Sequence, residues 1–147
     1  MQANFSLPQK IETFQSWFEV YRVSERTFAI CEPGHWEGVI SYLIAGQNKA
    51  VLLDTGMGIG DIKKVVNHLT RLEVSVVNSH THFDHIGGNH QFDKIAVFDD
   101  GFAIEKLERG RTVEELKGEM SQEFLFKPLP ERFDPKAYRI LPSKPTH

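Results

Sequence analysis

The sequence predicts an α/β fold in which a mixed sheet is flanked by helices. Three observations support this prediction. Short runs of β-branched and aromatic residues alternate with segments of helical periodicity. The 147 residues are enough for one domain with a buried core. Apolar residues make up 40% of the chain and charged residues 25%, as in ordinary globular proteins.

The first part of the chain is predicted to be mainly extended. Residues 1–17 are expected to form an irregular or short helical arm. Strands are predicted over Phe18–Val23 and Thr27–Cys31, because both runs are rich in β-branched and aromatic residues. A third strand covers residues 39–46, "VISYLIAG". A fourth, "AVLLDTG", is apolar up to Asp54, which is typical of a strand buried on both faces.

Strands and helices then alternate. Asp61 is a suitable N-cap for a helix over Ile62–Leu72, in which apolar residues recur at helical spacing. Two further strands and two further helices are predicted at residues 73–80, 94–100, 101–107 and 113–124. The last segment, residues 125–147, carries five of the seven prolines and is predicted to be a connector rather than part of the core. The whole chain, residues 1–147, is expected to be a single domain.

Composition excludes several classes of partner. A net charge of −3 argues against a general nucleic-acid-binding surface, which would be basic. The single cysteine, Cys31, excludes an internal disulfide and fits a reducing compartment. The N-terminal residues lack the apolar core of a secretion signal, and no apolar stretch is long enough to span a membrane. We therefore expect a cytoplasmic protein with neither nucleic acid nor membrane as partner.

The strongest functional signal is "NSHTHFDHIGG", residues 78–88, which places four potential metal ligands together: His80, His82, Asp84 and His85. In an extended segment the side chains of His80 and His82 project to the same side. Asp84 and His85 are adjacent, and Gly87-Gly88 allows the chain to turn behind them. One segment could then offer two ligands to one ion and two to a neighbouring ion.

Imidazole and carboxylate ligands suit zinc, and also iron or manganese. The alternative is a histidine-rich polar loop without a ligand, but this pattern rarely arises by chance at the end of a strand. The segment follows the carboxyl end of a predicted strand, where open α/β sheets usually place their binding sites.

The stretch "SHTHFDHIGGNH" resembles the H-x-H-x-D-H signature of the metallo-β-lactamase-fold metal-dependent hydrolases. "VLLDTG", about 25 residues upstream, resembles a companion motif of the same superfamily. The order of the elements also matches over residues 18–98. The resemblance implies a metallo-β-lactamase-type αβ/βα sandwich, of which this chain would contain about the first half, the N-terminal portion.

The resemblance also implies roles for individual residues. His80 and His82 would bind a first metal ion, and Asp84 and His85 a second, with Asp84 as the catalytic residue that also holds the reacting water. Asp54 would accept the second N–H of a ligand histidine and so orient it. In this family the loop that contains His35 and Trp36 often leans over the metal site, which makes both residues candidates for substrate contact; an ordinary loop with a packed tryptophan is the alternative.

The implied reaction is hydrolysis of a small-molecule substrate. A divalent ion lowers the pKa of bound water to about 7, so a metal-bound hydroxide would attack an ester, thioester, amide or phosphoester. Thioesterases of the glyoxalase II type, lactonases, phosphodiesterases and β-lactamases share the motif, so the substrate stays open. The low basic charge disfavours an RNA-processing nuclease, and the absence of a signal peptide disfavours a secreted antibiotic-degrading enzyme.

The sequence departs from the family pattern downstream of the motif. Members carry a further histidine, an aspartate and a final histidine in later strands, whereas His147 is the only histidine here after His90. The alternative to a hydrolase is therefore a truncated, catalytically incomplete metal-binding or structural module. In either case a half sandwich leaves a sheet face uncovered, so we expect self-association or association with the missing C-terminal half.

Overall fold

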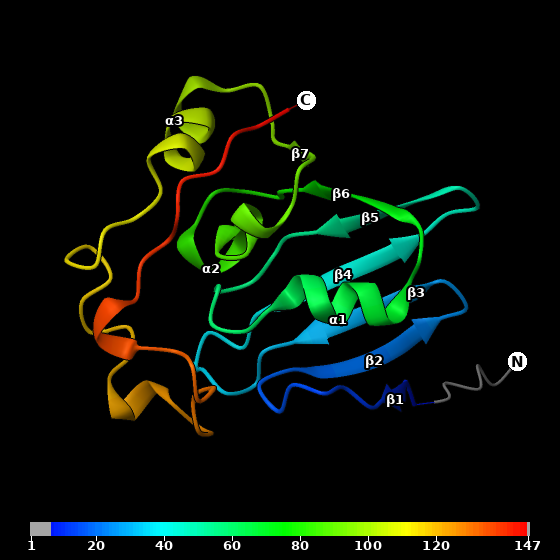
Figure 1. Cartoon of the computed structure of the whole chain (residues 1–147), viewed down its shortest axis with the longest axis horizontal. Coiled ribbons are helices and arrows are strands. Elements are labelled where there is room, and N and C mark those ends of the chain that lie inside the picture. Colours follow the sequence, from blue (N-terminus) through cyan, green and yellow to red (C-terminus); the bar gives the residue numbers. More distant parts are fainter. Residues whose placement is uncertain (1–6, 147) are drawn as a thin grey trace, which may run out of the picture.

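A seven-stranded mixed sheet forms the centre of the molecule, as predicted (Figure 1). The structure is a computed structural model that describes residues 7–146. The strands lie side by side in chain order: β1 Gln9–Ile11, β2 Glu19–Ser24, β3 Thr27–Cys31, β4 Ile40–Ala45, β5 Lys49–Leu53, β6 Glu73–Val77 and β7 Ile95–Ala96. Strands β1 to β5 pair antiparallel, whereas β5, β6 and β7 pair parallel.

Helices occupy one face and one end of the sheet. The α-helices are α1 Ile62–Leu69, α2 Phe83–Ile86 and α3 Gly101–Arg109, and short 3₁₀ turns are η1 Asn89–Gln91, η2 Gln122–Phe124 and η3 Pro135–Ala137. Asp61 caps α1 as predicted, with its carboxylate accepting from the Lys64 amide at 3.0 Å. The helix ends three residues earlier than predicted, because Thr70 adopts an extended conformation.

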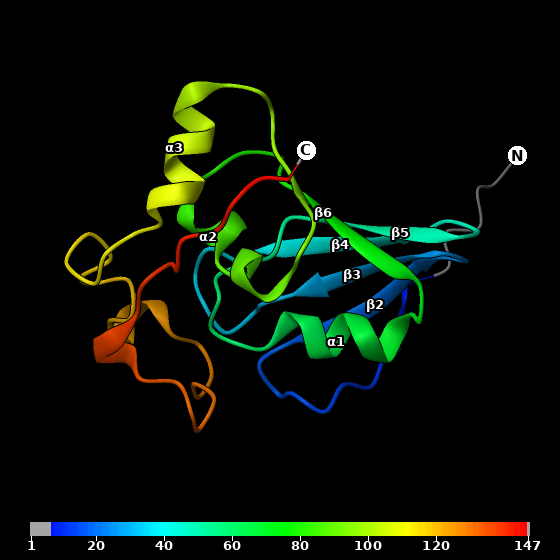
Figure 2. The ribbon, with the colours of Figure 1, turned by 45° about the horizontal axis from the view of Figure 1, so that its top comes forward.

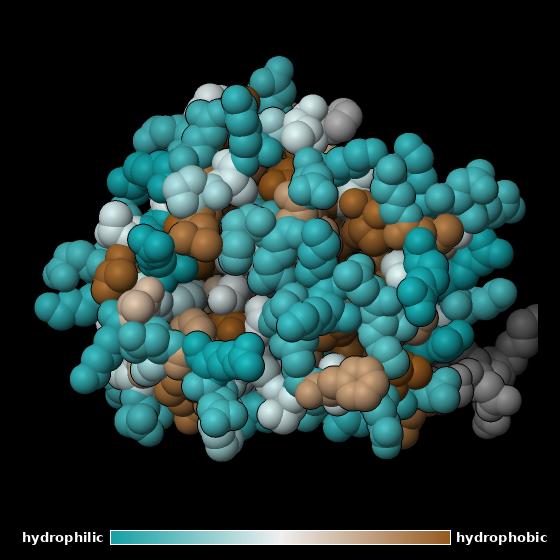
Figure 3. Space-filling model, in the orientation of Figure 1, coloured by the Kyte–Doolittle hydropathy of each residue, from teal (hydrophilic) through white to brown (hydrophobic). Residues whose placement is uncertain are grey.

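The core lies between the sheet and α1. One row of paired residues crosses strands β3 to β7 and is buried in each of these five strands: Phe28, Leu43, Leu52, Val76 and Ile95. Helix α1 packs on this side through its buried apolar positions, Ile62, Val65 and Val66. Figure 2 shows α1 lying along this face of the sheet. The outer surface of the molecule on the α1 side is mainly hydrophilic (Figure 3).

The opposite face of the sheet is apolar and open to solvent. Ile40, Tyr42 and Ile44 of β4 and Val51 of β5 are each more than one third exposed. No helix of the described residues covers them in either ribbon view (Figures 1 and 2). The prediction that β5 is buried on both faces is therefore wrong. Among the residues that the structure describes, nothing covers its second face, and the exposed and buried residues of β5 alternate.

Two predictions about the C-terminal part need correction. Residues 113–124 do not form an α-helix but a series of turns that ends in η2. Gly118 lies at a φ of +97°, which interrupts a helical path, and among the neighbouring side chains Leu116 is the buried apolar one. The predicted connector is mostly irregular over its described residues, 125–146, yet it contributes Tyr138 and Ile140 to the core.

The N-terminal arm also differs from the prediction, because residues 9–11 pair with β2 as an edge strand. None of the helices in the described residues combines the length and apolarity needed to cross a lipid bilayer.

The open sheet face gives a first prediction. We expect the chain to self-associate through it, because a contiguous apolar surface is normally covered by a partner. Ile44 and Val51 are cross-strand partners, so Ile44→Glu combined with Val51→Lys keeps a compatible pair while making the face polar. The double variant should weaken self-association at least about tenfold, roughly 1.4 kcal/mol, in light scattering over a dilution series.

Phe98→Ser is the matched control, because Phe98 is 80% exposed but lies outside the sheet. It should leave the association unchanged. A wild-type chain that stays monomeric at every concentration would contradict the prediction.

Candidate metal centre

The predicted ligand residues gather at the carboxyl ends of the parallel strands β5 and β6. Asp54 directly follows β5, and Ser79 and His80 follow β6 by two and three residues. His82 precedes α2, whose single turn contains Asp84 and His85. Parallel strands that end at the same edge bring these segments together, and Asp54 N–H donates to the Val77 carbonyl at 2.9 Å.

Asp54 occupies the centre of this arrangement. Its backbone lies in the left-handed region, with a φ of 61°, which is uncommon for a residue other than glycine. Its carboxylate accepts from the Ser79 amide at 2.8 Å and the Ser79 hydroxyl at 2.6 Å, and it lies 2.9 Å from His85 Nδ1. Burial opposes the ionisation of Asp54, but hydrogen bonds from His85 and Ser79 outweigh it and lower the pKa of this carboxyl.

His85 is held between two carboxylates. Its Nδ1 contacts Asp54, and its Nε2 lies 3.4 Å from Asp84 Oδ2. Hydrogen bonds to Asp54 and then to Asp84 raise the pKa of His85 to about 9 despite its burial. Burial likewise opposes the ionisation of Asp84, but the contact with His85 lowers the pKa of that carboxyl. A divalent cation binds ionised carboxylates and neutral imidazoles, so metal binding at pH 7 would have to displace the proton of His85.

His80 lies against His85, and His82 lies against His80; both are exposed. The ring of His80 is 4.0 Å from that of His85 and 4.7 Å from that of His82, measured between ring centroids. His80 Nδ1 lies 2.9 Å from the Ser79 hydroxyl. Burial, followed by the nearby charges of His85 and His82, lowers the pKa of His80, so its ring is neutral at pH 7, the form that binds metal.

The donor set fits a metal ion such as zinc. One ligand atom from each of Asp54, His80 and His85 lies within 4.8 Å of the other two. Asp54 could bind the ion directly together with His80 and His85. Alternatively Asp54 orients His85, and His82 and Asp84, which lie outside this group, shift to complete the ligands. The Asp54 carboxylate already has three hydrogen-bond contacts, two of them to Oδ2, so Oδ1 is the atom with room for a further partner.

A buried polar network behind the histidines was not predicted from the sequence. Asn89 Oδ1 accepts from the Thr55 hydroxyl at 2.8 Å, and Asn89 Nδ2 donates to Asn78 Oδ1 at 2.8 Å. The Thr55 amide donates to the His85 carbonyl at 2.9 Å. These contacts fasten the segment after β5 to the end of α2 and to η1. Small polar residues at a strand end are the one sequence signal that could have indicated them.

His35 and Trp36, the candidate substrate-contacting residues, are placed differently from each other. His35 is 1% exposed, its Nε2 lies 2.8 Å from the Glu119 carbonyl, and its Nδ1 accepts from the Glu37 amide. Its ring is thus turned into the fold. Trp36 is 52% exposed and packs against Phe124 with ring centroids 5.6 Å apart. Of the two, Trp36 is the side chain that the structure leaves open to a ligand.

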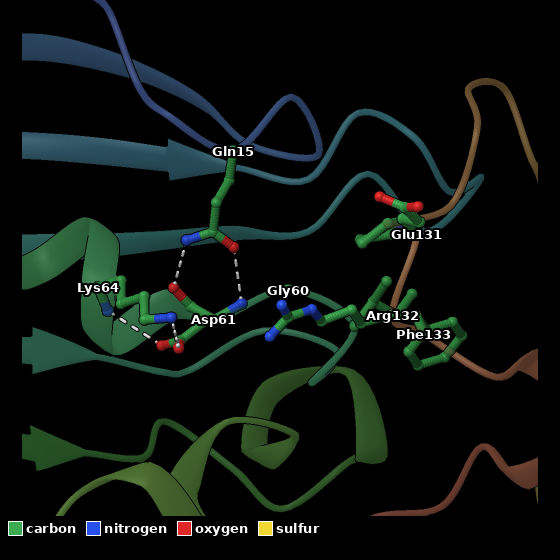
Figure 4. A pocket seen from close by; sticks show the side chains of 9 residues that line it. Gln15, Gly60, Asp61, Lys64, Glu131, Arg132 and Phe133 are labelled. Atoms are coloured by element: carbon green, nitrogen blue, oxygen red, sulfur yellow. Dashed lines mark hydrogen bonds and ion pairs between the residues drawn. The ribbon is translucent and has the colours of Figure 1, made fainter.

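A cavity of about 640 Å³ lies beside the start of α1 and is lined by none of the predicted metal ligands. Figure 4 shows its walls, which include Gln15, Asp61, Lys64 and the segment 130–133. The Gln15 side chain donates to the Asp61 carbonyl at 2.7 Å and accepts from the Asp61 amide at 2.9 Å. This double contact fastens the N-terminal arm to the first turn of α1.

Comparisons with known proteins identify the family and the fold. A family model described as the metallo-beta-lactamase superfamily matches residues 35–145. The human acyl-coenzyme A thioesterase MBLAC2 is 27% identical in an alignment of 117 positions that covers 71% of this chain and 41% of that protein.

Solved structures show the same fold. A metallo-beta-lactamase from Erythrobacter litoralis superposes with a TM-score of 0.52 at 16% identity, over 67% of this chain and 47% of that one. BJP-1, a subclass B3 metallo-beta-lactamase of Bradyrhizobium japonicum, gives 0.50 at 20% identity, over 78% and 45%. The chain therefore spans less than half the length of each of these relatives.

The contacts of His85 give a second prediction. In the metal-free chain His85 should titrate near pH 9, whereas His90, whose pKa is lowered by burial, should titrate below the ordinary histidine range. Asp54→Asn should lower the pKa of His85, because a neutral amide no longer favours the charged ring. Since the folded pKa lies above the unfolded value, stability from this contact is present below about pH 6.5 and is lost as the pH rises through 9.

NMR titration of the histidine ring protons measures both values. A pKa of His85 that is the same in wild type and in Asp54→Asn would contradict the assigned contact.

Proposed function

Because the chain belongs to the metallo-beta-lactamase superfamily, we propose that it provides the metal-binding segment of a metal-dependent hydrolase. The observation that carries the proposal is the convergence of His80, His82, Asp84 and His85 beside Asp54, at the carboxyl ends of β5 and β6. A histidine-rich loop without a ligand would not need a buried aspartate that accepts from one of its rings.

Each residue has a proposed task. His80, His82, Asp84 and His85 would hold one or two ions, with zinc the preferred metal and iron or manganese as alternatives. Asp54 orients the His85 ring through Nδ1 and leaves Nε2 facing Asp84. Asp84 is the proposed catalytic residue: the family resemblance gives it the reacting water, and its carboxylate lies 3.4 Å from His85 Nε2. When bound, a divalent ion supplies Lewis acidity that makes water nucleophilic near neutral pH.

A small-molecule thioester is the substrate class that we favour. The support is the human relative, an acyl-coenzyme A thioesterase. Esters, amides and phosphoesters remain within reach of the same chemistry. Trp36 is proposed to contact the substrate, because its loop lies within electrostatic reach of the site: burial, and then the negative charge of Asp84, raise the pKa of the neighbouring Glu37.

The second candidate function is a metal-binding or structural module that is catalytically incomplete. It is favoured by the ligand count, because Asp54, His80 and His85 are the one group of described residues whose ligand atoms lie close enough to share an ion. Zinc sites take at least three protein ligands, so two separate ions would each find too few among the four residues of this segment. A single ion shared by His80, His82 and His85 is compatible with the short distances between their rings.

Metal binding is the direct test of the proposal. Isothermal titration of the chain with Zn²⁺ should show binding that His80→Ala combined with His82→Ala weakens at least about tenfold, because two of four ligands are lost. His68→Ala combined with His90→Ala removes the same number of imidazoles outside the cluster and should leave the affinity unchanged. Equal affinity in wild type and the cluster variant would sink the proposal.

Catalysis gives a further prediction. In a chain long enough to be active on acyl-thioesters, Asp84→Asn should lower kcat at least about a hundredfold and change KM little, since the carboxylate acts mainly in the transition state. Asp61→Asn, outside the cluster, is the matched control and should leave kcat unchanged. A variant with wild-type kcat and a raised KM would show that Asp84 has a different role.

A further inference from the structure

The segment that follows β5 is held in an unusual conformation. Asp54, Gly56 and Gly58 all have positive φ angles, of 61°, 71° and 76°. Asp54 has a side chain, so this conformation costs free energy unless the surroundings enforce it. The residues that enforce it determine where the Asp54 carboxylate points.

Glu32, the residue after β3, is one of the residues that enforce this conformation. Its side chain is buried, with 2% exposed. Oε2 accepts from the Met57 amide at 3.0 Å, and Oε1 accepts from the Trp17 indole N–H at 2.9 Å. The carboxylate also packs so closely on Gly56 that a Cβ atom there would collide with it. Glu32 therefore fixes the middle of the segment that begins with Asp54.

The chemistry of the two partners explains why a carboxylate stands here. Both partners donate hydrogen bonds, so the side chain between them must offer two acceptor oxygens. An amide offers one acceptor and places an N–H against the other donor. Burial raises the pKa of Glu32 to about 7 although both hydrogen bonds favour its ionised form. Ionisation of Glu32 thus costs free energy, and no arginine or lysine within residues 7–146 pairs with it.

Tyr138 binds the other backbone group of Met57, the residue whose amide donates to Glu32. Its hydroxyl is buried and donates to the Met57 carbonyl at 2.7 Å. The amide and the carbonyl of Met57 are thus both bound by side chains from distant parts of the chain.

The segment is in turn bonded to the histidines. The Thr55 amide donates to the His85 carbonyl at 2.9 Å, and the Gly87 amide donates to the Gly56 carbonyl at 2.8 Å. A shift of residues 55–57 would therefore move His85 relative to Asp54.

We propose that Glu32 is a positioning residue of the metal centre: by binding Met57 and Trp17 it holds the segment after β5 so that Asp54 meets His85 Nδ1. Tyr138 assists from the other side of Met57. This inference rests on the proposed metal site, but its main readout does not require a metal.

Glu32→Gln tests the proposal in the complete chain. The readout is the His85 Nδ1 proton in NMR spectra of the metal-free protein, which its hydrogen bond to Asp54 should shift downfield and protect from exchange. In Glu32→Gln this signal should broaden or move toward that of free imidazole, and Zn²⁺ affinity should fall at least about fivefold. Tyr138→Phe removes a single hydroxyl and should change both quantities in the same direction by less.

Two controls separate positioning from stability. Phe28→Ala removes buried apolar volume in the first half of β3 and should lower the melting temperature without changing the His85 signal. Glu73→Gln makes the same chemical change as Glu32→Gln at an exposed position and should change neither.

A lower melting temperature in Glu32→Gln and Tyr138→Phe with an unchanged His85 signal would overturn the inference. If Glu32→Gln does not fold, an unchanged signal in Tyr138→Phe overturns it. A wild-type chain that binds no Zn²⁺ would contradict the proposed function, and the His85 signal would still decide the role of Glu32.

Discussion

The contact between Asp54 and His85 joins the two parts of the chain on which the candidate site depends. Asp54 ends β5, and His85 lies in α2, beyond the end of β6. Their 2.9 Å contact fixes one ring nitrogen of His85, and Ser79 fixes both oxygens of Asp54. A metal ligand must be oriented before the ion arrives, because reorientation weakens binding. The positive φ of Asp54 is the conformational cost of that orientation.

The mixed sheet explains why this contact can form. The antiparallel strands β1 to β5 build most of the core, while the parallel set β5 to β7 brings successive strand ends to one edge. Helix α1 covers one face of the sheet, whereas the opposite face exposes apolar side chains to solvent. The same architecture therefore provides both a site at the end of the sheet and a surface suited to a partner. The chain belongs to the metallo-beta-lactamase superfamily and spans less than half the length of the relatives described above.

Local sequence patterns were enough to predict most of the strands, helix α1 and the cluster of potential metal ligands. Strands β2 to β6 and α1 follow from runs and periodicity within single segments, and the ligand cluster follows from residues 80–85 alone. Asp54 was indicated by the "DTG" motif through a family resemblance, and its 2.9 Å contact with His85 agrees with the role implied there, which stays a proposal.

Long-range contacts could not be predicted in this way. Glu32 meets Met57 across 25 positions of sequence and Tyr138 meets it across 81, and neither residue has a neighbour that signals its partner. Residues 113–124 have the charged composition of a helix, but Gly118 at positive φ interrupts it. The proline-rich tail resembles a connector locally, although Tyr138 and Ile140 are buried in the core.

The central claim is that Asp54 orients His85 and leaves the ion to the histidines and Asp84. Anomalous diffraction from crystals of the chain grown with Zn²⁺ tests it most directly. The account predicts a zinc peak roughly 2.0–2.1 Å from imidazole nitrogens of the cluster, with the Asp54 carboxylate still bound to His85 Nδ1 and Ser79. A zinc ion bonded to the Asp54 carboxylate, or a peak away from the histidines, would contradict it.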